Sequence, residues 1–167
     1  RPDRAVVAIA VEDQGSDAGR VRMQRLASAS DRDLVRFLAW ALEPCTLVRV
    51  EGLRDAGILA ELDCRAAPAA GGDGGQPPRP PFAHLHDVQQ RLSGWLLGTH
   101  HAATSSELLD WYLDEFTFRF NRRSARHRGL LFYRLLEEAL VTPPQPYGAM
   151  VAASGDIAGK GRRSRAR

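Results

Sequence analysis

Four arginines in the C-terminal half stand at a spacing that suits phosphate binding: Arg119, Arg122, Arg123 and Arg126. On one helix, positions i, i+3, i+4 and i+7 share a face. Guanidinium groups this close repel one another unless an anion lies against them, and arginine can hold a phosphate with two parallel hydrogen bonds. The cluster, which Arg128 extends, therefore favours a nucleic-acid backbone as its partner. A solvated basic face, partly offset by preceding acidic residues, explains the same pattern equally well.

The composition indicates a globular protein and gives little further guidance to function. Of 167 residues, 44% are hydrophobic and 26% are charged, which are ordinary values for a folded domain. No apolar run is long enough to span a bilayer. The two cysteines, Cys45 and Cys64, have no CxxC spacing, which favours a reduced, cytoplasmic setting. The net charge is only +3 and Lys160 is the only lysine, so the position of the arginines says more than their number.

The elements that must position the arginines begin with a β/α segment. Residues 5–12 and 21–26 have the apolar and alternating patterns of a β-hairpin. Ser30, followed by an acidic first turn, opens a predicted helix that Glu43-Pro44 ends. Residues 46–50 predict another strand, and a short helix follows through Leu62. The chain has no initiator Met and enters the first strand almost at once, which suggests a fragment or a mis-started reading frame.

The second half is predicted to be helical. Residues 66–81 form a Gly/Pro-rich linker, and residues 82–141 predict helices with a break at Gly98-Thr99. The tryptophans Trp40, Trp95 and Trp111 are expected in the core. Phe118 is the aromatic expected at the surface, and most of the other aromatics are expected to pack between helices: Phe116, Phe120, Phe132 and Tyr133. The predicted organisation is an α/β part (1–65), the linker (66–81), a helical part (82–147) and a disordered basic tail (148–167).

Several motifs resemble one known family. WLLGTHH, YLDEFTFRFNRR and RGLLFYRLLEEAL resemble the C-terminal signature of the ISXO-type DDE domain of bacterial insertion-sequence transposases. VVAIAVED, GRVRMQRLASAS and VRVEGLRDAGIL are similar to its earlier strands and helix, so the resemblance covers roughly residues 5–147. It implies an RNase-H-like mixed sheet with flanking helices, in which three acidic side chains hold two Mg²⁺ ions for attack on a phosphodiester. It also implies DNA as the partner, no membrane, homo-oligomerisation, and a cytoplasmic, nucleoid-associated location.

The chain departs from the family pattern at all three acidic positions. The first family Asp, on the central strand of the sheet, precedes the part that this chain matches. Glu51 stands at the second position, where its extra methylene group disturbs the strict geometry of Mg²⁺. Arg91 stands at the third position, although the family His is kept as His86. A guanidinium 4 Å from another cation costs about 4 kcal/mol at an effective dielectric of 20, and Asp87 one turn earlier could neutralise it.

These departures predict an incomplete RNase-H-like domain that retains DNA binding through its arginines. Glu51 and Arg91 mark the altered catalytic positions, Glu51 is the one weak metal ligand, and Mg²⁺ is not expected to bind productively. The prediction is therefore a truncated transposase without strand-transfer activity. Two alternatives stay open: an active transposase whose first strand lies upstream, and a helical interaction module with no enzymatic role.

Overall fold

The computed structural model describes residues 5–51, 58–67, 80, 82–100 and 108–150. The described elements, in chain order, are β1 (Val6–Gln14), β2 (Asp17–Leu26), α1 (Asp31–Ala41), β3 (Leu47–Val48), α2 (Ile58–Glu61), β4 (Arg65–Ala66), α3 (Ala83–His100), α4 (Leu109–Asn121) and α5 (Arg128–Val141). The chain divides into two compact units, Arg1–Ala103 with β1 to α3 and Thr104–Arg167 with α4 and α5. None of the described helices combines the length and apolarity that crossing a membrane requires.

The predicted hairpin is confirmed, but its strands are longer than expected. β1 and β2 pair antiparallel from Val6↔Leu26 to Gln14↔Asp17, with an irregularity between Val11 and Asp13. The loop is therefore only two residues long, and Gly15 takes a φ of 77° that glycine adopts without strain. The polar sequence between residues 12 and 21 indicated a wide turn. In the structure, most of these residues belong to β1 and β2 at the turn end of the hairpin.

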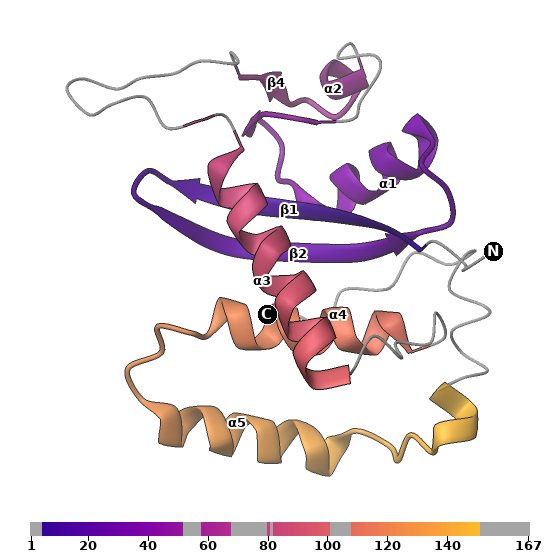
Figure 1. Ribbon diagram of the computed structural model, residues 1–167, viewed down its shortest axis with the longest axis vertical. Helices are drawn as coiled ribbons and strands as arrows, with labels where there is room; N and C mark the ends of the chain where they lie inside the picture. The colour runs from indigo at the N-terminus through magenta and orange to yellow at the C-terminus, as the bar shows by residue number, and fades with distance from the viewer. Residues whose placement is uncertain (1–4, 52–57, 68–79, 81, 101–107, 151–167) are drawn as a thin grey trace. The chain divides into compact units, whose positions relative to one another are not determined.

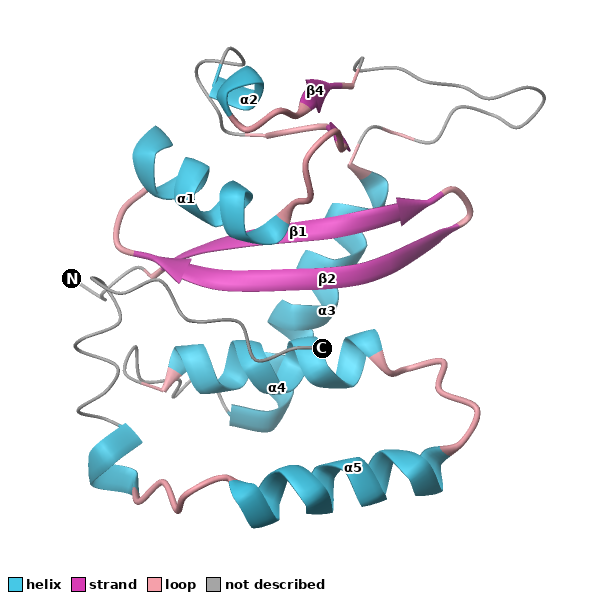
Figure 2. Cartoon of the chain, turned by 180° about the vertical axis from the view of Figure 1, so that it is seen from behind, coloured by secondary structure: helices cyan, strands magenta, loops and turns pink. Residues whose placement is uncertain are grey.

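Strand alternation gives the hairpin two apolar faces, and a helix covers each (Figures 1 and 2). On one face, Ala8 packs in the same apolar core as Phe37 and Leu38 of α1. The small side chain of Ala8 allows α1 to approach the hairpin closely. On the other face Val21 and Met23 of β2 are buried, and α3 crosses the hairpin there. Val88 and Leu92 are the buried residues of α3.

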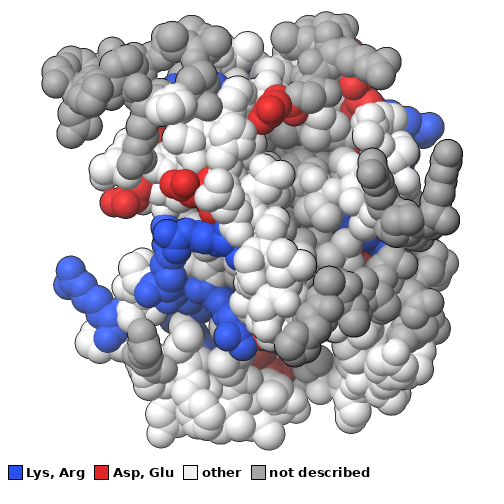
Figure 3. All heavy atoms as spheres, viewed as in Figure 1, with Lys and Arg blue, Asp and Glu red and all other residues white. Residues whose placement is uncertain are grey.

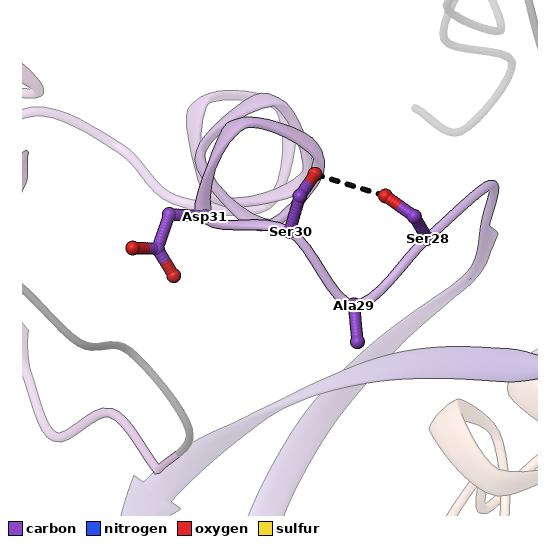
Figure 4. Close-up of a pocket in the computed structure, with 4 residues that line it drawn as sticks. All are labelled: Ser28, Ala29, Ser30 and Asp31. Carbon is purple, nitrogen blue, oxygen red and sulfur yellow. Dashed lines mark hydrogen bonds between the residues drawn. The ribbon is translucent and has the colours of Figure 1, made fainter.

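The predicted capped helix is confirmed as α1. Its N-cap Ser30 has an extended backbone, and its hydroxyl accepts a hydrogen bond from the Asp33 amide at 3.3 Å. The Ser28 hydroxyl donates to Oδ2 of Asp33 at 2.7 Å and lies 3.0 Å from the Ser30 hydroxyl (Figure 4). These bonds hold the pKa of the Asp33 carboxyl below its ordinary value, chiefly through Ser28. Ser28 and Ser30, which line a pocket at this helix start, are therefore already engaged in hydrogen bonds with Asp33.

A second, smaller sheet shares the core of the first. β3 and β4 pair in parallel, with Leu47 opposite Arg65. The sequence predicted β3 over residues 46–50 but not β4, and both strands are only two residues long. Their buried residues join one cluster with β1 and α1: Ala8, Phe37, Leu38, Val48, Leu59 and Cys64. The two sheets are thus held by one apolar core, although no backbone ladder joins them in the described residues.

Three expectations about the helices and aromatics are corrected. α3 runs through Gly98-Thr99 to His100 without a break, because an isolated glycine weakens a helix but does not end it. Trp40 is 38% exposed rather than core, and the Arg22 guanidinium lies 5.5 Å from its ring centroid. Phe118 is half-buried, since the Arg122 guanidinium lies 4.0 Å from its ring centroid. The predicted linker and tail lie mostly outside the described residues.

The second unit contains two helices of different character. α4 has a buried apolar face that includes Leu113, Phe116 and Phe120, and the two phenyl rings stack with centroids 5.8 Å apart. α5 has no fully buried residue among its described side chains, and its aromatic pair Phe132 and Tyr133 is exposed. Of the aromatics expected mostly to pack between helices, Phe116 and Phe120 are therefore buried, whereas Phe132 and Tyr133 are exposed among the described residues.

Candidate functional site

Charged side chains from three elements of the first unit meet near the ends of β1 and β3 and the start of α3. Oδ2 of Asp13 lies 3.5 Å from the Arg49 guanidinium, and Oδ1 lies 3.6 Å from Nε2 of His84. The same imidazole nitrogen lies 3.1 Å from the Gly15 carbonyl oxygen, and the His84 side chain is only 13% exposed. Asp13 also accepts a hydrogen bond from the Gly15 amide. This network ties the hairpin turn to α3 and to the segment after β3.

Glu51 and His86, the two family positions that the sequence singled out in this region, are brought together. Nε2 of His86 lies 3.8 Å from Oε2 of Glu51. The two side chains are 54% and 59% exposed, so solvent reaches the pair from outside. Glu51 follows β3, and His86 lies in the first turn of α3. The fold therefore brings together two residues that are far apart in the sequence.

Arg91 does not join this pair. Its side chain is exposed on α3, more than one turn beyond His86. No ion pair links Arg91 to Asp87 in the part of the chain that is described, so the predicted neutralisation is not formed. The structure thus places Glu51 beside the retained family histidine and leaves the substituted position at the surface.

The described residues around Glu51 do not fit a Mg²⁺ site. Mg²⁺ requires hard oxygen ligands at about 2.1 Å in octahedral geometry. The neighbour of Glu51 is an imidazole, and the carboxylate of Asp13 is already engaged by Arg49 and His84. Among the described residues, no group of three or more His, Cys, Asp or Glu side chains is arranged to hold a metal ion.

The arginine cluster does not lie on one helical face. α4 ends at Asn121, and Arg122 is its C-cap with φ −114° and ψ 11°. The amides of Arg122 and Arg123 bond to carbonyls three residues back, at 3.3 Å and 3.2 Å, which tightens the chain into turns. The side chains of Arg122, Arg123 and Arg126 therefore project from a turn, and the predicted i, i+3, i+4, i+7 face is wrong.

Three arginines of the cluster, Arg119, Arg122 and Arg123, each have a distinct local partner. Arg119 forms an ion pair with Glu115 at 2.6 Å. Arg122 lies over the Phe118 ring and Arg123 over the Phe120 ring, both with the guanidinium carbon 4.0 Å from the centroid. Arg123 also donates to the Phe120 carbonyl at 2.9 Å, a favourable position for a cation at a helix C-terminus.

The side chains of Arg123 and Arg126 are exposed, and those of Lys and Arg are drawn blue in Figure 3. Guanidinium groups stacked on rings keep their donor edges free to point outward in the ring plane. The segment from Arg119 to Arg126 can therefore present fixed donors to an anion. The backbone of Arg128 begins α5, but its side chain lies outside the described residues.

Sequence reasoning did not single out Asp13, Arg49 or His84. Asp13 looked like a turn residue, and Arg49 and His84 had no recognisable spacing to it. The signal that could have found them is polarity within otherwise apolar elements, since Arg49 interrupts the apolar run from Leu47 to Val50. Their contact depends on the crossing of α3 over the hairpin, which no local pattern encodes.

A family model described as the ISXO2-like transposase domain matches residues 1–121. The chain belongs to this family. The matched range ends where α4 ends, so the turn arginines after residue 121 and all of α5 lie beyond it. No curated protein and no solved structure matches the chain.

Membership defines the class of function. The matched domain is that of a transposase of insertion sequences, and the mixed α/β architecture is compatible with it. A transposase-type function is therefore the functional class of this domain.

Proposed function

We propose that this chain is a DDE-type insertion-sequence transposase domain of RNase-H-like architecture that binds DNA through the arginines of the segment from Arg119 to Arg128 and does not by itself transfer DNA strands. The observation that carries the proposal is the family match together with two arginines held over aromatic rings, half-buried Arg122 and exposed Arg123. A homo-oligomeric, cytoplasmic and nucleoid-associated transposase belongs to the same proposal.

The strand order supports an RNase-H-like sheet that lacks its central strand. β3 directs the carbonyls of Thr46 and Val48 to β4, where Arg65 and Ala67 donate to them. Because successive residues of a strand point their backbone groups to opposite sides, Leu47 faces away from β4. In the described residues neither that edge of β3 nor the second edge of β1 is paired with a strand. The apolar core that both sheets share holds β1 and β3 within one unit, which supports this proposal.

Electrostatics and rigidity support DNA as the ligand of the arginines. A double helix carries one phosphate charge per about 1.7 Å of its axis, so several closely spaced cations can contact it at once. Holding Arg122 and Arg123 over rings lowers the conformational entropy that they would lose on binding. Arg119 contributes less, since Glu115 already neutralises it.

Salt dependence of DNA binding tests this role. Duplex binding is measured by fluorescence anisotropy from 50 to 200 mM salt for the chain and for Arg122→Ala/Arg123→Ala. Each lost phosphate contact removes about 0.9 from the slope of log K against log salt, so the double variant should flatten the slope by about 1.8. The ratio of affinities at the two salt concentrations should then shrink about twelvefold.

The matched control is Arg32→Ala/Arg36→Ala, which removes the same charge from exposed positions of α1. If the arginines of the cluster make the phosphate contacts, the slope of log K against log salt for this control should equal that of the unchanged chain. Equal flattening in both double variants, or affinity that ignores salt, would contradict a DNA-binding arginine cluster and favour a helical interaction module.

A strand-cleavage assay tests the catalytic part of the proposal. The purified chain is incubated with a terminal-repeat duplex and Mg²⁺ or Mn²⁺, and no cleavage above background is expected. Cleavage is not expected because the residues at the family's acidic positions are poor ligands for a metal ion: Glu51 faces His86, and Arg91 replaces an acid. Metal-dependent cleavage that disappears on Glu51→Ala would overturn this part.

A second candidate function is an active transposase whose first strand and first acid come from upstream sequence. The two unpaired edges favour it. It is tested by extending the chain with the upstream reading frame and repeating the assay. Cleavage that requires an acid in the added strand would establish it, although Arg91 would remain an obstacle.

A further inference from the structure

Phe118 lies on the opposite side of α4 from the buried residues of that helix. The buried residues are Leu109, Asp110, Leu113, Phe116 and Phe120. At 100° per residue, Phe118 lies roughly 160° around the helix from the centre of this buried stripe. The apolar stripe of α4 therefore does not explain why a large aromatic side chain stands at position 118.

The Phe118 ring supports Arg122, which stands four residues later. The guanidinium carbon of Arg122 lies 4.0 Å from the ring centroid, which is within the range of a cation–π contact. The amide of Arg122 also donates to the carbonyl oxygens of Arg119 and Phe120. Because the helix end fixes the backbone and the ring lies against the guanidinium, both ends of the Arg122 side chain are held.

This support differs from the support of Arg119 in its effect on charge. The carboxylate of Glu115 holds Arg119 and also neutralises it. In the part of the chain that the structure describes, Arg122 forms no ion pair, and the ring that holds it has no net charge. Phe118 therefore restricts the motion of Arg122 and leaves its positive charge to an external anion.

The neighbouring ring, Phe120, has a second role that Phe118 does not share. Phe120 is buried and stacks on Phe116, and its carbonyl oxygen accepts a hydrogen bond from the Arg123 guanidinium. A change at Phe120 would therefore disturb the apolar face of α4 together with the arginine. Phe118 is the position at which support of an arginine can be altered separately from the buried stripe.

We propose that Phe118 is a positioning residue for DNA binding, and that its ring holds Arg122 in the orientation that contacts a phosphate. This inference rests on the proposed function, in which the arginine cluster binds DNA. A cation–π contact at an exposed site favours the held conformation about two- to fivefold. Without the ring, Arg122 would lose more rotamer freedom on binding, so the affinity should fall by about the same factor.

The salt dependence of duplex binding separates position from charge. Phe118→Leu should weaken binding about two- to fivefold at every salt concentration. The slope of log K against log salt should stay unchanged, because the number of phosphate contacts is the same, whereas Arg122→Ala should flatten it by about 0.9. Phe118→Tyr keeps a ring and should bind as the unchanged chain does. The matched control is Phe132→Leu, the same substitution at an aromatic of α5 that is 65% exposed, and it should leave the affinity unchanged.

A double-mutant cycle shows whether Phe118 acts through Arg122. In an Arg122→Ala background, Phe118→Leu should cause no further loss of affinity, because the guanidinium that the ring holds is already absent. An equal loss in both backgrounds would mean that the ring supports the fold and not the arginine, and it would overturn the proposal.

The order of the Arg122 side chain can be measured in the unchanged chain without DNA. The heteronuclear NOE of the Nε–H group should be high for Arg122 and low for Arg126, which is exposed and has no ring against it among the described residues. Equal mobility of the two groups would overturn the proposal, even if Phe118→Leu does not fold.

The outcomes for the ring and for the cluster can be told apart. Unchanged affinity in Phe118→Leu, together with a flattened slope in Arg122→Ala, would overturn the role of Phe118 and leave DNA binding by the arginine cluster in place. A slope that Arg122→Ala does not change would overturn the phosphate contact of Arg122, and the role of Phe118 with it.

Discussion

Replacing Phe37 by alanine should destabilise the first unit more than any other single change on α1. The ring is 2% exposed, packs in the cluster that joins both sheets, and lies 6.0 Å from the Trp40 ring between centroids. Deleting a buried phenylalanine side chain costs about 3–5 kcal/mol in transfer and cavity terms. Since small domains unfold with a free energy of about 5–15 kcal/mol, this loss is a large share of the total.

Urea unfolding followed by circular dichroism measures the effect. With a slope of about 1.5 kcal/mol per molar urea, the midpoint for Phe37→Ala should fall by about 2–3 M. Phe37→Leu, which keeps most of the apolar volume, should lose less than about 1.5 kcal/mol. Leu47→Ala is the exposed control, at 63% exposure in β3, and should change stability by less than about 0.5 kcal/mol. Equal shifts for Phe37→Ala and Leu47→Ala would refute a core shared by the two sheets.

Two further changes address local interactions. Ser30→Ala should cost about 1 kcal/mol by removing the N-cap acceptor of α1, and Ser30→Asn should recover most of it; unfolding midpoints measure both, and a neutral Ser30→Ala would refute the capping role. The Arg20 amide donates to Glu12 at 2.9 Å and holds the pKa of that carboxyl below 4.5. The charge of Glu12 therefore stabilises the fold above that pH, and this stability is lost as pH falls through the lowered pKa. In a stability–pH titration, the free energy of unfolding of Glu12→Gln should therefore lie below that of the unchanged chain at neutral pH, and this difference should shrink as the pH falls through the lowered pKa of Glu12. A difference that stays the same over this pH range would contradict the stabilising role of the Glu12 charge.

Local signals predicted the elements that are stabilised locally. The hairpin carries its own alternation, and α1 carries its own cap, so both were found from the sequence. β4 was missed because two residues have no periodicity, and its strand character exists only through pairing with β3. The end of α4 was missed for a different reason. No glycine or proline stands near Arg122, and the helical repeat continues past the point where the backbone turns.

The candidate site shows the same division. The sequence singled out Glu51 and His86 by resemblance, but only the crossing of α3 brings them within 3.8 Å. The network of Asp13, Arg49 and His84 could not be read in advance, because each residue lies on a different element and none has a conspicuous neighbour in sequence.

The sequence by itself determined the family, the hairpin, the capped helix and the presence of an arginine cluster, because these depend on residue order and short-range periodicity. Tertiary structure decided which charged groups meet, where the arginine-bearing helix ends and which apolar side chains of α5 stay exposed. These outcomes depend on the packing of distant segments against one another. Burial and pairing are properties of contacts that form only in the folded chain.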